Sequence, residues 1–221
     1  MELAAGFLFT EGIVGSPDQI KRIRHCGIPV SGEPQNTVVV ELADKLEIDL
    51  KRLERNFYTT SSCGVCGKSS IDALHTGEKK IAGRNHPKIR SSLIHRLPDI
   101  LREFQKVFEQ TGGLHASAVF NARGEIEIVR EDVGRHNALD KVIGAKFLAG
   151  ETPLSNKILL VSGRASFELV QKALMAGIPI LAAVGAPSSL AVELAAEFGM
   201  TLAGFVRDGR FNIYTGHERI V

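Results

Sequence analysis

Two cysteines separated by two residues, Cys63 and Cys66, are the side chains whose spacing first suggests chemistry. The pair follows four consecutive hydroxyl residues at positions 59–62, and glycines occupy positions 64 and 67. In proteins, a Cys-x-x-Cys pair can supply half of a structural zinc site, act as a thiol-disulfide redox centre, or carry a sulfur atom as a persulfide. Each use requires different neighbouring residues.

The neighbours of this pair favour sulfur carriage but leave the other two uses open. A structural zinc site needs four ligands, and His25, Cys26 and His75 do not form a regular second pair. A thioredoxin-like redox site lies between a strand and a helix, whereas residues 59–67 read as a mobile loop rich in glycine and hydroxyl groups. Sulfur carriage needs an exposed, mobile thiol, and Lys68 beside the pair would favour the thiolate.

A second set of candidate residues follows three predicted strands. Each strand ends in glycine, hydroxyl or guanidinium groups, which let a phosphate approach the backbone closely or grip it with a bidentate fork. Ligands of open parallel sheets bind beyond the carboxyl ends of the strands, so we expect a phosphate-bearing ligand at this edge. Each loop by itself could equally be an ordinary strand-to-helix turn in which a serine caps the helix. The loops are Ser162-Gly163-Arg164, residues 185–189 and residues 207–210.

A fourth loop, residues 130–137, adds two polar side chains to the same edge. Arg135 and His136 fall in the first turn of a helix that Asp132 can cap, so both can face the crevice at the strand ends. A solvated helix start with a local ion pair to Glu131 or Asp132 is an equally good interpretation of these residues.

The hydrophobic pattern predicts an α/β fold with one mixed sheet covered by helices. Strands alternate with helices in the C-terminal half, which is typical of parallel neighbours joined by helical crossovers. We expect one domain overall, with a core at 111–221 and an N-terminal region at 1–110 that contains a mobile loop at 59–68. The predicted strands are 37–42, the hairpin 116–120 and 126–130, 158–161, 180–184, 202–206 and 210–214, and the predicted helices are 3–14, 99–110 after Pro98, 132–149, 166–176 and 188–198.

Composition limits the classes of partner. The 221 residues are 44% hydrophobic, enough to bury a core, and the net charge of +2 is too small to indicate nucleic acid as the partner. No apolar run approaches the roughly 20 residues that span a bilayer, so no membrane association is expected. Three cysteines are an odd number and too few for a disulfide scaffold. A protein of the cytoplasm, where thiols stay reduced, is the expectation.

The remaining histidines and the third cysteine carry less information. His86 and His95 read as solvated side chains of a polar linker, and Cys26 reads as a buried or incidental thiol. His115-Ala116-Ser117 is similar to the H-x-E start of zinc-dependent cytidine deaminases, but Ser117 stands in place of the glutamate and the cysteine pair lies upstream. The sequence therefore argues against deaminase chemistry while it remains compatible with a deaminase-like fold.

Several runs, taken together and in order, resemble the formate dehydrogenase accessory sulfurtransferases, the FdhD family. They span nearly the whole chain, and their combination is far more specific than the Cys-x-x-Cys pair alone. Members usually carry an additional segment ahead of the stretch that resembles residues 2–8, close to where this chain begins. The matching runs are Cys63–Gly67, residues 113–118, residues 130–138, Ser162-Gly163-Arg164 and residues 205–214.

The resemblance implies a cytidine-deaminase-like mixed sheet, a homodimer, and a cytoplasmic role in the maturation of formate dehydrogenase. A cysteine desulfurase would donate sulfur, and the acceptor would be the molybdenum cofactor, bis-molybdopterin guanine dinucleotide. Cys63 matches the persulfide-bearing cysteine and Cys66 its partner, and no metal held by protein side chains is implied. The segment associated with cofactor binding matches Phe205, Val206, Arg207, Asp208, Gly209 and Arg210.

Two alternatives of other classes stay open. A chaperone that binds the molybdenum cofactor without carrying sulfur would tolerate Cys63→Ala. A nucleotide-binding domain with a structural zinc would contain stoichiometric metal and would unfold in the presence of chelators.

Overall fold

The computed structural model describes residues 1–26, 37–44 and 86–221. The predicted mobile loop at 59–68, which contains Cys63 and Cys66, lies outside the described residues, as does His75. The mobile loop and the sulfur-carrying role of its cysteines therefore stay predictions. No helix of the described part is long and apolar enough to cross a membrane.

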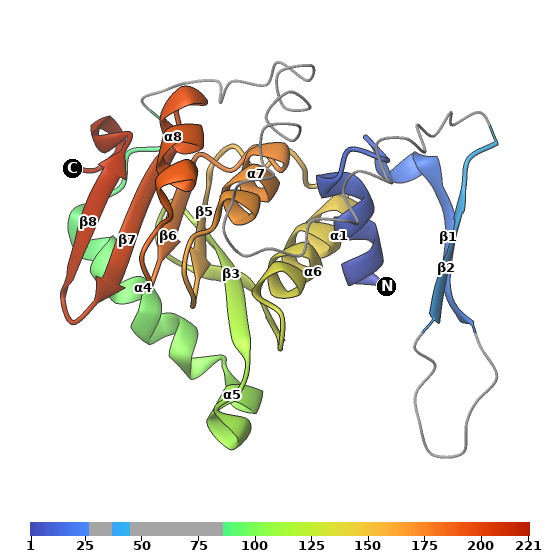
Figure 1. Cartoon of the computed structure of the whole chain (residues 1–221), viewed down its shortest axis with the longest axis horizontal. Helices are drawn as coiled ribbons and strands as arrows, with labels where there is room; N and C mark the ends of the chain where they lie inside the picture. Colours follow the sequence, from blue (N-terminus) through green and yellow to red (C-terminus); the bar gives the residue numbers. More distant parts are fainter. Residues whose placement is uncertain (27–36, 45–85) are drawn as a thin grey trace.

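A six-stranded mixed sheet forms the centre of the fold, with strand order β4-β3-β5-β6-β7-β8 (Figure 1). β5, β6 and β7 are parallel, whereas β3 runs antiparallel to both β4 and β5, and β8 runs antiparallel to β7. The predicted mixed sheet, including its hairpin, is therefore confirmed. The strands are β3 (His115–Asn121), β4 (Ile126–Asp132), β5 (Lys157–Val161), β6 (Ile180–Ala183), β7 (Thr201–Arg207) and β8 (Arg210–Thr215).

Helices cover both faces of the sheet. Alternate residues of β5 divide between two hydrophobic clusters, Leu159 facing one and Leu160 the other. The first cluster includes residues of α1 (Glu2–Thr10), α6 (Arg135–Leu148), α7 (Phe167–Met175) and α8 (Ser189–Glu197). The second includes residues of α4 (Ser91–Glu103), which is followed by the short α5 (Lys106–Thr111). Two 3-10 turns, η1 (Pro17–Gln19) and η2 (His217–Arg219), complete the helical elements of the described residues.

The N-terminal helix packs directly onto α6 through two glycines. A Cβ on Gly6 would lie 1.8 Å from the carbonyl oxygen of Asp140, and one on Gly144 would lie 1.9 Å from that of Glu2. The two backbones therefore meet without intervening side chains. Glu2 also accepts two hydrogen bonds of 2.6 Å from the Arg130 guanidinium. These contacts join α1, which belongs to the predicted N-terminal region, to the sheet and to α6.

A separate two-stranded sheet pairs β1 (Ile20–Cys26) with β2 (Thr37–Leu42) in antiparallel orientation (Figure 1). The prediction placed β2 correctly and missed β1, in which Lys21, Arg22 and Arg24 interrupt the apolar pattern. Cys26 is the last residue of β1 and is half-buried, so it lies at a strand end and not in the interior.

The predicted helix at 99–110 was wrong at its start and in its continuity. α4 begins at Ser91 and contains Pro98, and a break at residues 104–105 separates it from α5. Ile94, Leu97 and Leu101, spaced along one face of α4, are fully buried. Their burial against the sheet outweighs the cost of an internal proline.

Two further details differ from the prediction. His95 belongs to α4, where its ring lies 4.8 Å from that of Phe211, and it is not part of a polar linker. The N-cap of α6 is Gly134 and not Asp132, which ends β4. Asp132 still supports the helix start, because its carboxylate accepts a hydrogen bond of 2.9 Å from the Gly134 N–H.

Candidate anion-binding site at the strand ends

The three predicted loops meet at one edge of the sheet. The Gly185 N–H donates to the Gly163 carbonyl at 3.0 Å, and the Phe205 N–H donates to the Gly185 carbonyl at 3.1 Å. Backbone hydrogen bonds therefore link the loops that follow β5 and β6 to the end of β7. Because β3 is antiparallel to β5, its first residue, His115, lies at the same edge.

Close packing explains the glycine of the loop after β6. A Cβ on Gly163 would come 3.4 Å from His115 Nδ1, and one on Gly185 would come 3.1 Å from the Arg164 backbone. A side chain at position 185 would crowd the loop after β5, and glycine there lets the two loop backbones approach one another. At position 163 a Cβ would make an ordinary van der Waals contact with His115 of β3. Backbone contacts between the loops therefore bring the side chains of His115, Arg135 and Arg164 to one edge.

Arg135 is the most informative cation at this edge. It is the first residue of α6, and its Cδ would lie 3.9 Å from a Cβ on Gly163, so the side chain reaches the loop after β5. Its Nε is buried and has no hydrogen-bond partner among the described residues. A buried guanidinium nitrogen without an acceptor is costly, and a bound anion would supply that acceptor. Arg164 is exposed in the adjacent loop.

The alternative interpretation, a local ion pair at the start of α6, does not fit the described contacts of Arg135. Asp132 pairs with Lys141 at 2.5 Å, and Glu131 accepts backbone hydrogen bonds from Val107 and Phe108 at 3.2 and 2.9 Å. Both carboxylates are thus engaged by other groups.

His136 is held by α7. Its Nε2 lies 3.2 Å from the Ser166 hydroxyl and 3.8 Å from a carboxylate oxygen of Glu168. The hydrogen bond with His136 is the largest cause that lowers the pKa of Glu168, to about 2, against the opposing effect of burial. The imidazole is therefore fixed beside the edge by a carboxylate that stays ionised in moderately acidic solution.

We expect Glu168→Gln to reduce the acid sensitivity of the fold. The pKa of Glu168 is lowered in the folded state, so its contribution to stability is present above the unfolded value near 4.5 and is lost as pH falls toward about 2. The side chain is 46% exposed, so solvent screening limits the effect at pH 7 to less than about 1 kcal/mol. Urea unfolding at pH 7, 4 and 3 measures it. The control is Glu193→Gln, at an exposed position of α8. If the free energy of unfolding depends on pH in the same way in both variants, Glu168 does not contribute to the acid sensitivity.

The predicted cofactor-binding residues occupy the turn between β7 and β8. Phe205 and Asp208 have left-handed backbone angles, with φ of 55° and 53°. Such conformations are strained for residues other than glycine and persist where the surroundings enforce them, often at binding sites. The side chain of Val206 is buried, and Asp208, Gly209 and Arg210 are exposed.

Three of these predicted residues line one pocket. A cavity of about 330 Å³ is bounded by Phe205, Arg207, Arg210, Phe211 and Asn212. The Arg207 guanidinium carbon lies 5.9 Å from the Phe205 ring centroid, so the aromatic face supports the cation. The turn therefore combines an aromatic surface with two arginines, which suits a flat group attached to phosphate.

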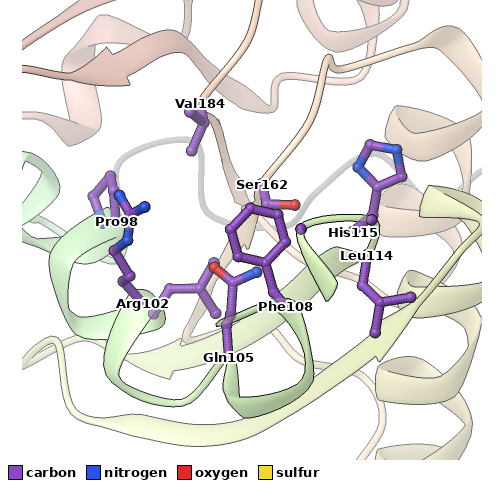
Figure 2. A pocket seen from close by; sticks show the side chains of 11 residues that line it. Pro98, Arg102, Gln105, Phe108, Leu114, His115, Ser162 and Val184 are labelled. Atoms are coloured by element: carbon purple, nitrogen blue, oxygen red, sulfur yellow. The ribbon is translucent and has the colours of Figure 1, made fainter. Parts of the chain in front are cut away.

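A larger cavity, of about 440 Å³, adjoins the other side of the edge (Figure 2). It lies between α4, α5 and the ends of β3, β5 and β6, and sequence reasoning missed it. In residues 1–26, 37–44 and 86–221, no group of three or more His, Cys, Asp or Glu side chains is placed to hold a metal ion. The lining residues are Pro98, Leu101, Arg102, Gln105, Phe108, Gly112, Gly113, Leu114, His115, Ser162 and Val184.

The sequence of this chain is similar to those of known proteins. The family model of the FdhD/NarQ family matches residues 1–221. The chain is 53% identical to the sulfur carrier protein FdhD of Streptomyces avermitilis, over 99% of this chain and 78% of the relative. It is 49% identical to the sulfur carrier protein FdhD of Mycobacterium tuberculosis, over 99% of this chain and 81% of the relative.

A solved structure shares the fold. The crystal structure of a protein described as a formate dehydrogenase accessory protein, from Desulfotalea psychrophila, aligns with a TM-score of 0.73 and 27% sequence identity. The alignment covers 100% of this chain and 79% of that protein.

Proposed function

Because the chain belongs to the FdhD/NarQ family, we propose that it is a sulfurtransferase that carries sulfur on Cys63 and delivers it to a molybdenum cofactor. The observation that supports this most directly is the unpaired, buried Arg135 Nε at an edge where three loops meet. It supports the proposal because a phosphate oxygen of the acceptor would supply the partner that this nitrogen lacks. Formate dehydrogenase is the proposed recipient enzyme, and a homodimer in the cytoplasm remains a prediction of the resemblance.

Loading of sulfur follows thiol-persulfide exchange. The Cys63 thiolate attacks the terminal sulfur of a persulfide on a cysteine desulfurase. The sulfur–sulfur bond of the donor breaks, a new one forms on Cys63, and the donor cysteine leaves as a thiolate. The proton of the donor persulfide stays with the transferred sulfur, so this step needs no external oxidant or reductant.

Delivery requires the terminal sulfur to leave Cys63. If the Cys66 thiolate attacks the Sγ of Cys63, a disulfide forms and the terminal sulfur departs as hydrosulfide. Hydrosulfide can then replace an oxygen ligand of the acceptor, which leaves as water after protonation. A dithiol reductant must afterwards reduce the disulfide, which regenerates both thiolates for the next cycle.

The described residues fit the proposed acceptor, bis-molybdopterin guanine dinucleotide. Its pyrophosphate groups need cations, which Arg135 and Arg164 can supply. The cavity that Phe205 and Arg207 line offers an aromatic wall for a flat ring system.

Transfer of radiolabelled sulfur from cysteine tests the proposal. The purified chain is incubated with an active cysteine desulfurase, and the label it retains is then chased into formate dehydrogenase together with the molybdenum cofactor. Label that appears on the chain, is released by reductant and moves with the cofactor supports a carrier. Activation of formate dehydrogenase without any label on the chain would favour the alternative, a cofactor-binding chaperone that carries no sulfur.

Arg135→Met is expected to weaken binding of guanosine diphosphate, a probe of the dinucleotide end, by roughly 10- to 100-fold. A hydrogen bond between a charged group and phosphate contributes about 1.5–3 kcal/mol, and 1.4 kcal/mol corresponds to a tenfold change in affinity. Methionine keeps the length of the side chain and removes a buried unpaired nitrogen, so the free energy of unfolding should be equal or higher.

Calorimetric titration measures the affinity for guanosine diphosphate, and urea unfolding measures the free energy of unfolding. Arg96→Met, on the exposed side of α4, serves as the control and should change neither. A loss of stability with unchanged binding would show instead that Arg135 has a structural role.

A further inference from the structure

A histidine, a hydroxyl and a carboxylate meet beside the strand ends, and the loading and delivery steps described above do not use them. His136 lies at the start of α6, and Ser166 and Glu168 lie at the start of α7. The Nε2 of His136 is 3.2 Å from the Ser166 hydroxyl and 3.8 Å from a carboxylate oxygen of Glu168. Two polar partners therefore hold one nitrogen of the imidazole ring.

The second ring nitrogen of His136, Nδ1, is open to proton exchange. No hydrogen bond joins Nδ1 to the part of the chain that the structure describes, and Nδ1 is not buried without a partner. The side chain as a whole is 37% exposed. A histidine with one nitrogen held by a carboxylate and the other accessible has the arrangement of a general acid or base.

Glu168 supports the proton-donating form of this ring. The hydrogen bond with His136 is the largest cause that lowers the pKa of Glu168, to about 2, so the carboxylate is ionised at neutral pH and attracts an imidazolium. Arg135, next to His136 in α6, and Arg164, ahead of α7, oppose this attraction. Asp132 at the end of β4 is already paired with a lysine of α6.

Delivery of sulfur needs one proton that the exchange of ligands does not supply. In the proposed step, hydrosulfide replaces an oxygen ligand of the acceptor, and that oxygen leaves as water. Water contains two protons and hydrosulfide brings one, so another group must donate the second. Sulfur enters and oxygen leaves in the same oxidation state, so no electron is transferred and the step needs no oxidant or reductant.

The strand-end edge offers few groups that could donate this proton near neutral pH. Arg135 and Arg164 stay protonated, whereas histidine exchanges a proton between about pH 5 and 8. His115 and His136 both lie at this edge. Of these two, only His136 lies within ion-pair distance of a carboxylate among residues 1–26, 37–44 and 86–221.

We propose that His136 donates this proton from Nδ1 to the oxygen that leaves the acceptor, while Ser166 and Glu168 hold the ring through Nε2. The inference rests on the proposed function for the acceptor, and it adds a catalytic residue to the delivery step. The neutral ring that remains after donation takes up a proton from water, which prepares it for the next cycle.

The rate of sulfur delivery at a series of pH values tests the proposal. The full chain, loaded with labelled sulfur, is mixed with bis-molybdopterin guanine dinucleotide and a dithiol reductant, and the label on the acceptor is followed over time. General acid catalysis typically contributes about 10²–10⁴-fold, so His136→Gln should slow delivery by about 100-fold. The variant should also lack the decline in rate that the wild type shows as histidine loses its proton, between about pH 5 and 8.

Three further variants separate proton donation from a structural role. His217→Gln, at a position 88% exposed in η2, is the matched control and should deliver sulfur as the wild type does. Glu168→Gln removes the charge that attracts the imidazolium, so the decline in rate should move to lower pH. Imidazole added to His136→Ala should restore part of the delivery rate, because it can donate the missing proton without repairing the packing of the helix.

Equal delivery rates and equal pH profiles in the wild type and His136→Gln would overturn the proposal. Loss of the pH dependence in His115→Gln but not in His136→Gln would also overturn it and would assign the proton to His115. Loading of Cys63 does not use this proton, so uptake of label should stay at the wild-type level in every variant. A wild-type chain that takes up or delivers no label would instead refute the proposed function, so the two failures are distinguishable.

Discussion

Cys63→Ala is expected to abolish the uptake of labelled sulfur from a cysteine desulfurase. A persulfide forms on a thiolate, and alanine removes the proposed nucleophile. The expected loss is complete within the detection limit of the assay. The measurement is the label retained on the purified chain after non-reducing separation from the donor, compared with wild type.

Two cysteine variants give this experiment its controls. Cys26→Ala changes a half-buried thiol at the end of β1, far in sequence from the loop, and should load as the wild type does. Cys66→Ala should still accept label but should release less of it to an acceptor, because the proposed displacement of hydrosulfide needs the second thiolate. Full loading of Cys63→Ala, with loading lost in Cys66→Ala, would exchange the two roles and refute the assignment made from the resemblance.

The strands that position the site were predictable because both of their faces are buried. Continuous apolar runs at 158–161, 180–184 and 202–206 each bounded a strand to within one residue at either end. Their parallel arrangement then followed from the intervening helices, and the convergence of the glycine-containing loops followed from parallel strands. For this part of the site, the apolar pattern of the sequence was enough to predict which loops lie together.

The second cavity was not predictable by the same reasoning. Pro98 suggested a helix start, whereas the burial of Ile94 and Leu97 against the sheet carries α4 through the proline. Gln105 falls at the break between α4 and α5, where no periodicity marks which way a side chain points. Its place in the wall of the cavity is a consequence of tertiary packing, which appears only once the helices are docked on the sheet.

The attachment of α1 depends on a second feature that sequence pattern did not reveal, a buried ion pair between α6 and α7. Lys172 Nζ lies 3.0 Å from a carboxylate oxygen of Asp140, and their side chains are only 8% and 3% exposed. Lys172 also lies 2.9 Å from the Thr10 hydroxyl and 3.0 Å from the Glu11 carboxylate, so one ammonium group joins α1, α6 and α7. Burial raises the pKa of Asp140, and Lys172 opposes that rise by stabilising the charged form.

Lys172→Met should therefore destabilise the chain by about 3–5 kcal/mol, because it leaves the Asp140 carboxylate buried without its cation. Lys21→Met, which removes an exposed ion pair with Asp44, is the matched control and should cost less than about 1 kcal/mol. Urea unfolding followed by circular dichroism measures both variants at pH 7.

The cause can be separated from a simple loss of packing by a double variant and by pH. Lys172→Met combined with Asp140→Asn removes both charges of the pair and should recover much of the lost stability, because replacing a buried pair costs far less than breaking it. With Lys172 absent, the pKa of Asp140 should rise further, so the folded state binds its proton more tightly than the unfolded state does. The single variant should then regain stability as pH falls through the folded pKa of Asp140 toward its unfolded value. A loss that is independent of pH and unaffected by Asp140→Asn would instead assign the effect of Lys172 to packing of its side chain against α1.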